Sequence, residues 1–130
     1  MTDAIDELRA AQPVLLTLHK ALLDAERAQV EGVHGAMSGA EFLQLVSDPV
    51  RYGWLGPFSR LIVAIDDTLN PREDEEVAEP SDLLDQAREL VLPPNDDTPF
   101  GRRYLSLLQL DPGLVMAHSA AVETLTPRST

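Results

Sequence analysis

Residues 15–27 read LLTLHKALLDAER, and this stretch decides the fold class of the 130-residue chain. Its leucines recur at spacings of three and four residues, the period of an α-helix with one apolar face. Two polar side chains, His19 and Glu26, fall near the middle of that face, where further leucines are expected. The stretch therefore predicts a helix packed against others, with two polar groups that need partners inside the packing.

Helix start and stop signals recur along the rest of the chain, and the alternation typical of β-strands does not. Ser38 and Glu41 have the spacing of a capping box. Proline follows a capping residue at three further places: Asp48-Pro49, Thr98-Pro99 and Asp111-Pro112. Because prolines of this kind occupy the first turn of a helix, these signals predict an all-α protein.

The expected architecture is a compact helical bundle of four to five main helices with short extra turns, in one domain that spans residues 1–130. Pro13 predicts a break or kink in the first helical segment, because it removes a backbone donor and clashes with the preceding turn. Residues 71–80, PREDEEVAEP, are expected to form a mobile acidic loop, and residues 126–130 a frayed tail.

The charge of the chain narrows its classes of partner. With 22 acidic and 10 basic residues it carries a net charge of −12. Such a protein repels nucleic acid and anionic membrane surfaces, so neither is an expected partner. The chain holds no cysteine, no signal-peptide pattern at Met1 and no apolar run of membrane-spanning length, which predicts a cytoplasmic protein.

Glu26 raises the sharpest question about chemistry, because a lone carboxylate is costly to bury. His19 lies two helical turns away, too far for a simple contact, so a partner from another helix is expected. The candidate partners are His118, Arg51, Arg60, Arg103 and Tyr104.

Three interpretations of these polar groups stay open. The first is a satisfied structural contact that fixes helix register. The second places Glu26 at the rim of a groove or at an oligomer interface. The third is a ligand or divalent-metal site in the bundle core, formed by His19, Glu26 and His118 with Asp66 as a fourth member. The sequence does not contain the Glu-x-x-His spacing of di-iron bundles, and no cofactor is predicted outright.

An aromatic cluster lies at a helix junction, in the segment YGWLGPF. Tyr52, Trp54 and Phe58 surround two glycines and a proline there. The residues are typical either of core packing or of an aromatic-lined pocket or partner surface. No nucleotide-binding loop, HExxH motif or nucleophile elbow occurs in the chain, so no catalytic residue is assigned.

Four segments together resemble a family of small bacterial all-helical proteins that has no assigned biochemical function: LLTLHKALLDAER, EFLQLVSDP, WLGPFSRLIVAIDD and RRYLSLLQLDP. The resemblance covers most of the chain except the acidic loop. It implies an all-helical fold and a bacterial cytoplasmic setting, and it transfers no site residue.

The sequence thus favours a non-enzymatic helical protein that acts through protein contacts, with homodimerisation as one form of such contact. The alternative is a metal- or small-ligand-binding bundle that uses the inward cluster of His19, Glu26 and His118.

Overall fold

The computed structural model describes residues 3–73, 76–92 and 97–126, with the side chains at positions 50 and 51 left out. Its elements are α1 (Ala4–His34), α2 (Gly39–Val46), α3 (Pro49–Tyr52), the 3-10 turn η1 (Gly53–Leu55), α4 (Gly56–Leu69), α5 (Pro80–Val91), α6 (Pro99–Leu110) and α7 (Pro112–Leu125). No strand occurs among the described residues, which confirms the all-α prediction. Six of the helices have eight or more residues, so the expected number of four to five was too low.

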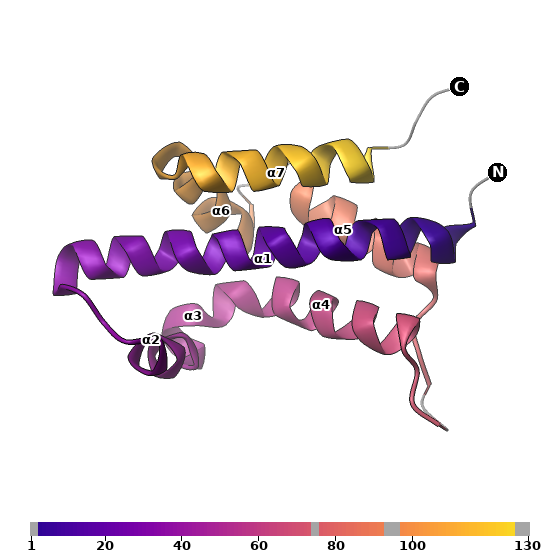
Figure 1. Ribbon diagram of the computed structural model, residues 1–130, viewed down its shortest axis with the longest axis horizontal. Helices are drawn as coiled ribbons and strands as arrows, with labels where there is room; N and C mark the ends of the chain where they lie inside the picture. The colour runs from indigo at the N-terminus through magenta and orange to yellow at the C-terminus, as the bar shows by residue number, and fades with distance from the viewer. Residues whose placement is uncertain (1–2, 74–75, 93–96, 127–130) are drawn as a thin grey trace.

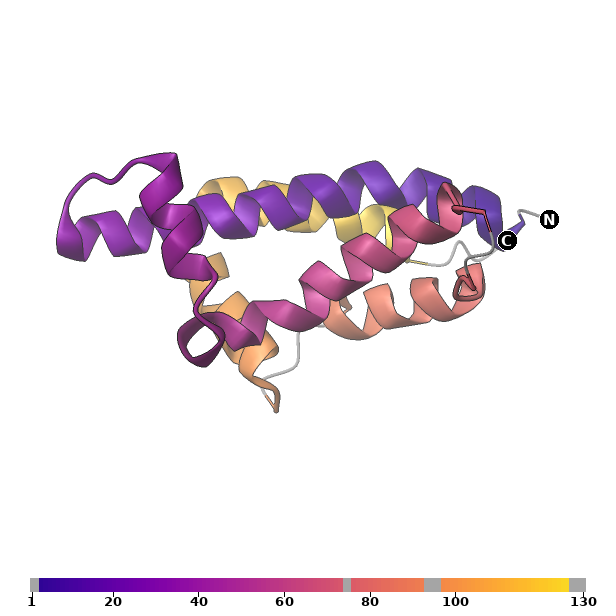
Figure 2. The ribbon, with the colours of Figure 1, turned by 90° about the horizontal axis from the view of Figure 1, so that it is seen from below.

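Helix α1 forms the axis of the molecule and contacts α4, α5, α6 and α7. Figure 1 shows α7 and α4 on opposite sides of α1, both antiparallel to it. In Figure 2, α5 and α6 lie below α1 and α7, and α6 runs across the axis of α1. The last turns of α1 extend past α7, and there α1 lies close to the short α2. None of the described helices is long and apolar enough to span a membrane.

The leucine face of α1 supplies the centre of the core. Leu8, Leu15, Leu18 and Leu22 are fully buried against residues of the four surrounding helices. Each buried leucine contributes about 1.5–3 kcal/mol relative to an exposed one. That burial explains why α1 reaches 31 residues, more than twice the length of any other helix.

The break predicted at Pro13 does not occur, because α1 runs through Pro13 without interruption. Pro13 lies on the exposed side of the helix, between the buried Ala11 and Leu15. Proline has no N–H group, so the backbone carbonyl four residues before Pro13 has no amide to accept from. That carbonyl can therefore face water. The cost of an interior proline, about 3 kcal/mol, is outweighed by the leucines buried on both sides of it.

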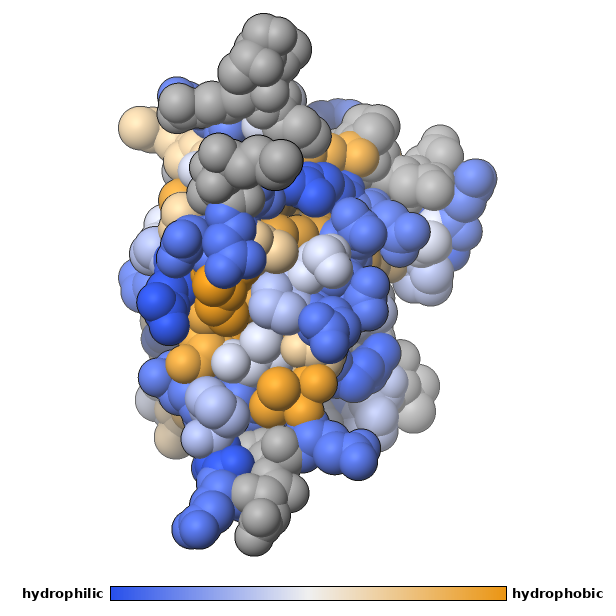
Figure 3. Space-filling model, turned by 90° about the vertical axis from the view of Figure 1, so that its right-hand side faces the viewer, coloured by the Kyte–Doolittle hydropathy of each residue, from blue (hydrophilic) through white to orange (hydrophobic). Residues whose placement is uncertain are grey.

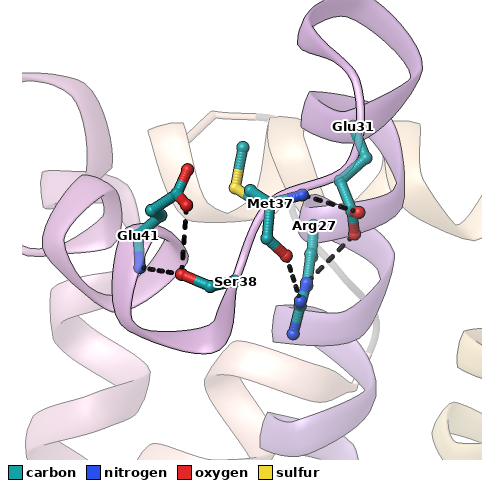
Figure 4. A network of polar contacts seen from close by, with 5 residues as sticks. All are labelled: Arg27, Glu31, Met37, Ser38 and Glu41. Carbon is teal, nitrogen blue, oxygen red and sulfur yellow. Dashed lines mark hydrogen bonds and ion pairs between the residues drawn. The ribbon is translucent and has the colours of Figure 1, made fainter.

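The turn from α1 into α2 is held by a polar network, drawn in Figure 4. Gly35 ends α1 with a φ of 85°, a conformation that glycine adopts without strain. Arg27 donates from Nε to Glu31 Oε1 at 3.0 Å and from Nη2 to the Met37 carbonyl at 2.6 Å. Glu31 Oε2 accepts from the Met37 amide at 3.2 Å. The guanidinium of Arg27 also lies 5.8 Å from the centre of the Phe42 ring, so one arginine ties α2 to α1.

Three of the four predicted caps, those of Ser38, Thr98 and Asp111, are present as side-chain hydrogen bonds. Ser38 Oγ accepts from the Glu41 amide at 3.1 Å, and its hydroxyl donates to Glu41 Oε1 at 3.2 Å, so the carboxylate returns to the serine side chain (Figure 4). The other two side-chain caps are Thr98 Oγ1 accepting from Gly101 N and Asp111 Oδ1 accepting from Leu114 N, each at 3.0 Å. These bonds satisfy first-turn amides and fix where α2, α6 and α7 begin.

The acidic segment ends earlier than predicted, because Pro80 is the first residue of α5 rather than the last of a loop. Thr68 Oγ1 donates to the Ala78 carbonyl at 3.1 Å, which ties the segment to the end of α4. Residues 74–75 and 127–130 lie outside the described residues. The mobility of residues 71–80 and the fraying of residues 126–130 therefore stay predictions.

Candidate functional site

Glu26 finds its partner on α6. Arg103 donates from Nε to Glu26 Oε2 at 2.9 Å, and its Nη2 forms an ion-pair contact with the same oxygen at 2.8 Å. The side chain of Glu26 is 8% exposed and that of Arg103 is 34% exposed. The pair joins residues 77 positions apart in the sequence, and the buried carboxylate is compensated by a cation that still reaches water.

His19 has a different partner, on α4. Its Nε2 lies 3.0 Å from Ser59 Oγ, and its ring stacks on Phe58 with 5.5 Å between the centroids. Burial lowers the pKa of His19 below its usual value of 6.5, because the charged imidazolium is poorly solvated there. His19 is therefore a neutral ring that links α1 to α4.

His118 has a third partner, on α6. Its Nδ1 is hydrogen-bonded to the Tyr104 hydroxyl, and the two rings meet edge to face at 5.3 Å. Burial lowers the pKa of His118 and raises the pKa of the Tyr104 hydroxyl, since both charged forms lose hydration. The contact joins α6 to α7 with both groups neutral.

The two histidines lie at opposite ends of a column of rings through the core. Successive centroids are separated by 5.5 Å, 5.7 Å, 5.5 Å and 5.3 Å along the series His19, Phe58, Phe100, Tyr104 and His118. Three aromatic rings therefore lie between the two imidazoles. Each histidine forms one polar end of this column and bonds a hydroxyl there.

The structure thus does not bring His19, Glu26 and His118 together, because each is paired with a different residue: Ser59, Arg103 and Tyr104, respectively. Asp66 lies apart from them, on the exposed side of α4, where its Oδ1 accepts from Asn70 at 3.1 Å. Within the described ranges, no three His, Cys, Asp or Glu side chains are close enough to hold a metal ion. This geometry agrees best with the first of the three interpretations, in which satisfied polar contacts between helices fix their register.

An open pocket of about 500 Å³ lies beside the Glu26–Arg103 pair. It is formed by the last turns of α1, by α3 and η1, and by α6. Its lining residues are Glu26, Gln29, Val30, Val33, His34, Tyr52, Trp54 and Arg103. Glu26 is thus both paired in the interior and open to a groove, which combines two of the sequence interpretations.

The three aromatic residues of the junction divide between the two roles that the sequence left open. Tyr52 and Trp54 line the pocket. Phe58 does not: it is fully buried in the ring column, between His19 and Phe100. Tyr52 and Trp54 therefore line a pocket and also pack inward, since Tyr52 is 6% exposed and the Trp54 ring lies 6.3 Å from that of Phe100, whereas Phe58 serves core packing alone.

The pocket also contains residues that sequence analysis did not select, among them Gln29, Val33 and His34. These residues follow Glu26 on one face of α1 at helical spacing, so that spacing was a usable signal once Glu26 was suspected. Ser59 gave no local signal, because only the packing of α4 on α1 brings it to His19.

The open atoms of the ion pair determine what the pocket can bind. Glu26 Oε1 makes no hydrogen bond to any described residue, and it is not sealed from solvent. Arg103 Nη1 likewise makes no hydrogen bond within the described part of the chain. The pocket therefore presents one strong acceptor and one strong donor next to valine and aromatic walls.

No protein-family model, curated protein or solved structure matches this chain. The resemblance to a family of small bacterial helical proteins stays a prediction, and the function must be argued from the site itself.

Proposed function

We propose that this protein is a non-enzymatic binding module that acts through protein contacts, and that the groove beside Glu26 and Arg103 is its binding site. The observation that carries the proposal is the composition of the groove. A tryptophan, a tyrosine and an arginine line it, and these residue types dominate the binding energy of protein interfaces.

Exposure along α1 supports this site. Val30 is 8% exposed at the base of the groove, whereas Val33, one turn further, is 79% exposed. Arg103 keeps a third of its side chain accessible and is held in place by Glu26. A fixed arginine beside an exposed apolar side chain is typical of a preorganised binding surface.

The opposite end of the molecule has a different surface. Figure 3 views the end where α1 begins and α4 finishes, and it shows mainly hydrophilic residues with separate, small apolar patches. A surface of that kind keeps an acidic protein in solution. This contrast favours the groove end as the place of contact.

The test compares what the wild type and two variants capture from a native cell extract. Val33→Glu places a charge at the rim of the groove without touching the core. Leu43→Glu is the matched control, since Leu43 is 64% exposed on α2 and does not line the groove. We expect a protein retained by the wild type and by Leu43→Glu to be lost with Val33→Glu. Equal retention by all three proteins would contradict the proposal.

A second candidate function, self-association, is favoured by the outward face of α7. Val115 is 42% and Met116 is 74% exposed there, and Glu123 is the only acidic residue in the helix. Two copies of a protein of charge −12 repel each other unless they meet through a face with few acids. Light scattering of the wild type, Met116→Glu and Leu43→Glu tests this. A dimer lost only with Met116→Glu supports it, and a monomeric wild type at about 0.1 mM overturns it.

A further inference from the structure

We infer that the groove recognises an uncharged, extended peptide segment, in which the N–H and C=O groups of one residue bond the Glu26–Arg103 pair and an apolar side chain packs between Val33 and Trp54. This inference rests on the proposed binding function and specifies the chemistry of the partner.

The Glu26–Arg103 ion pair leaves one acceptor atom and one donor atom open to a ligand. Both contacts of the pair end on Glu26 Oε2, so Oε1 remains an acceptor for a ligand. They use Nε and Nη2 of Arg103, so Nη1 remains a donor. One residue of an extended peptide presents its N–H donor and its C=O acceptor on the same side of the chain, and is therefore complementary to this pair.

The charges of Glu26 and Arg103 disfavour a charged ligand. A ligand carboxylate would bond Arg103 but would meet the Glu26 carboxylate and the field of a protein with net charge −12. A ligand ammonium would bond Glu26 but would meet the Arg103 guanidinium, which is already fixed at 2.8 Å from the carboxylate. An amide gains both hydrogen bonds and repels neither group. Local neutrality thus selects an uncharged hydrogen-bonding partner.

A further feature is the shape of the groove. Val30 and Val33 form one wall and Tyr52 and Trp54 contribute another, beside the polar pair. A volume of about 500 Å³ falls within the range of about 300–1,000 Å³ that is typical of ligand pockets. The open form of the groove leaves room for the chain to continue on both sides of one inserted side chain.

The chain carries its own reporter for the test. Trp54 is its only tryptophan and lines the groove, so tryptophan fluorescence reports binding there without a label. Four probes share one isobutyl side chain and differ in charge: N-acetyl-leucinamide is neutral, leucinamide is a cation, N-acetyl-leucine is an anion and leucine is a zwitterion. Each is titrated at pH 7.5 into the full-length protein, Val33→Glu and Leu43→Glu.

We expect N-acetyl-leucinamide to bind at least about tenfold more tightly than each charged probe, a difference of about 1.4 kcal/mol. Val33→Glu should weaken that binding at least tenfold, and Leu43→Glu should leave it unchanged. The double variant Glu26→Leu/Arg103→Met should remove the preference for the neutral probe, because it removes the donor and the acceptor together. It leaves no charge unpaired and so preserves the fold.

The outcomes separate the two proposals. If a charged probe binds most tightly and Val33→Glu abolishes its binding, the groove is a binding site but the amide inference is wrong. If no probe changes the Trp54 signal, or if Val33→Glu and Leu43→Glu bind alike, the inference is overturned. In that case the binding function is decided by the capture experiment alone.

Discussion

Removing Arg103 should harm the protein much more than removing Glu26, although both changes break the same ion pair. The two side chains differ in exposure, 34% for Arg103 and 8% for Glu26. Without Arg103, the Glu26 carboxylate stays buried with no compensating charge. Without Glu26, the arginine turns into the water that it already reaches.

The expected losses in free energy of unfolding follow from this difference in exposure. Breaking a buried pair by removing one partner costs about 3–5 kcal/mol, and the open side of this pair places Arg103→Met at about 3 kcal/mol. Glu26→Leu should cost about 1 kcal/mol or less, because it trades a hydrogen-bonded carboxylate for apolar contact. The double variant should be close to the wild type.

Urea unfolding, followed by far-ultraviolet circular dichroism at pH 7, measures the free energy of unfolding of the wild type, the two single variants and the double variant. The unfolding entropy of 130 residues, at about 2.1 cal/mol/K per residue, is about 0.27 kcal/mol/K. Arg103→Met should therefore also lower the melting temperature by about 11 °C. Equal costs for the two single variants, or a double variant less stable than Arg103→Met, would refute the reasoning from exposure.

Three further outcomes are expected. Tyr104→Phe should lower the free energy of unfolding by about 1–2 kcal/mol, because it leaves His118 Nδ1 without its hydroxyl partner; a urea titration measures this, and an unchanged midpoint would show that the bond adds no stability. Leu18→Ala should cost about 2–5 kcal/mol, since Leu18 is 0% exposed at the centre of the core; a loss under 1 kcal/mol in the same assay would place Leu18 outside the tightly packed region. The ring protons of His19 and His118 should titrate in nuclear magnetic resonance spectra with midpoints below 6.5, because burial lowers both pKa values. The unfolded chain then binds protons more readily, so the contribution of these histidines to stability is complete above about pH 6.5 and is lost as the pH falls below it; midpoints at or above 6.5 would contradict the burial argument.

The helical class and most helix boundaries could be predicted because their causes are local. Leucine spacing determines the buried face of α1, and a capping side chain followed by proline determines where α6 and α7 begin. Pro13 was one exception. A proline inside a helix carries a local cost in free energy. Whether the helix breaks there also depends on the apolar area that the continuous helix buries on either side. That area is a property of the packed molecule and cannot be read from the segment alone.

The site could be predicted only in part, and the limit is again physical. The sequence by itself determined that Glu26 and His19 lie on an apolar face and need partners, because helical periodicity and the cost of burying a polar group are properties of one segment. Only the tertiary structure decided that the partners are Arg103 and Ser59, 77 and 40 residues away. Such pairings depend on how the helices cross, and the crossing is set by the packing of all the helix faces together.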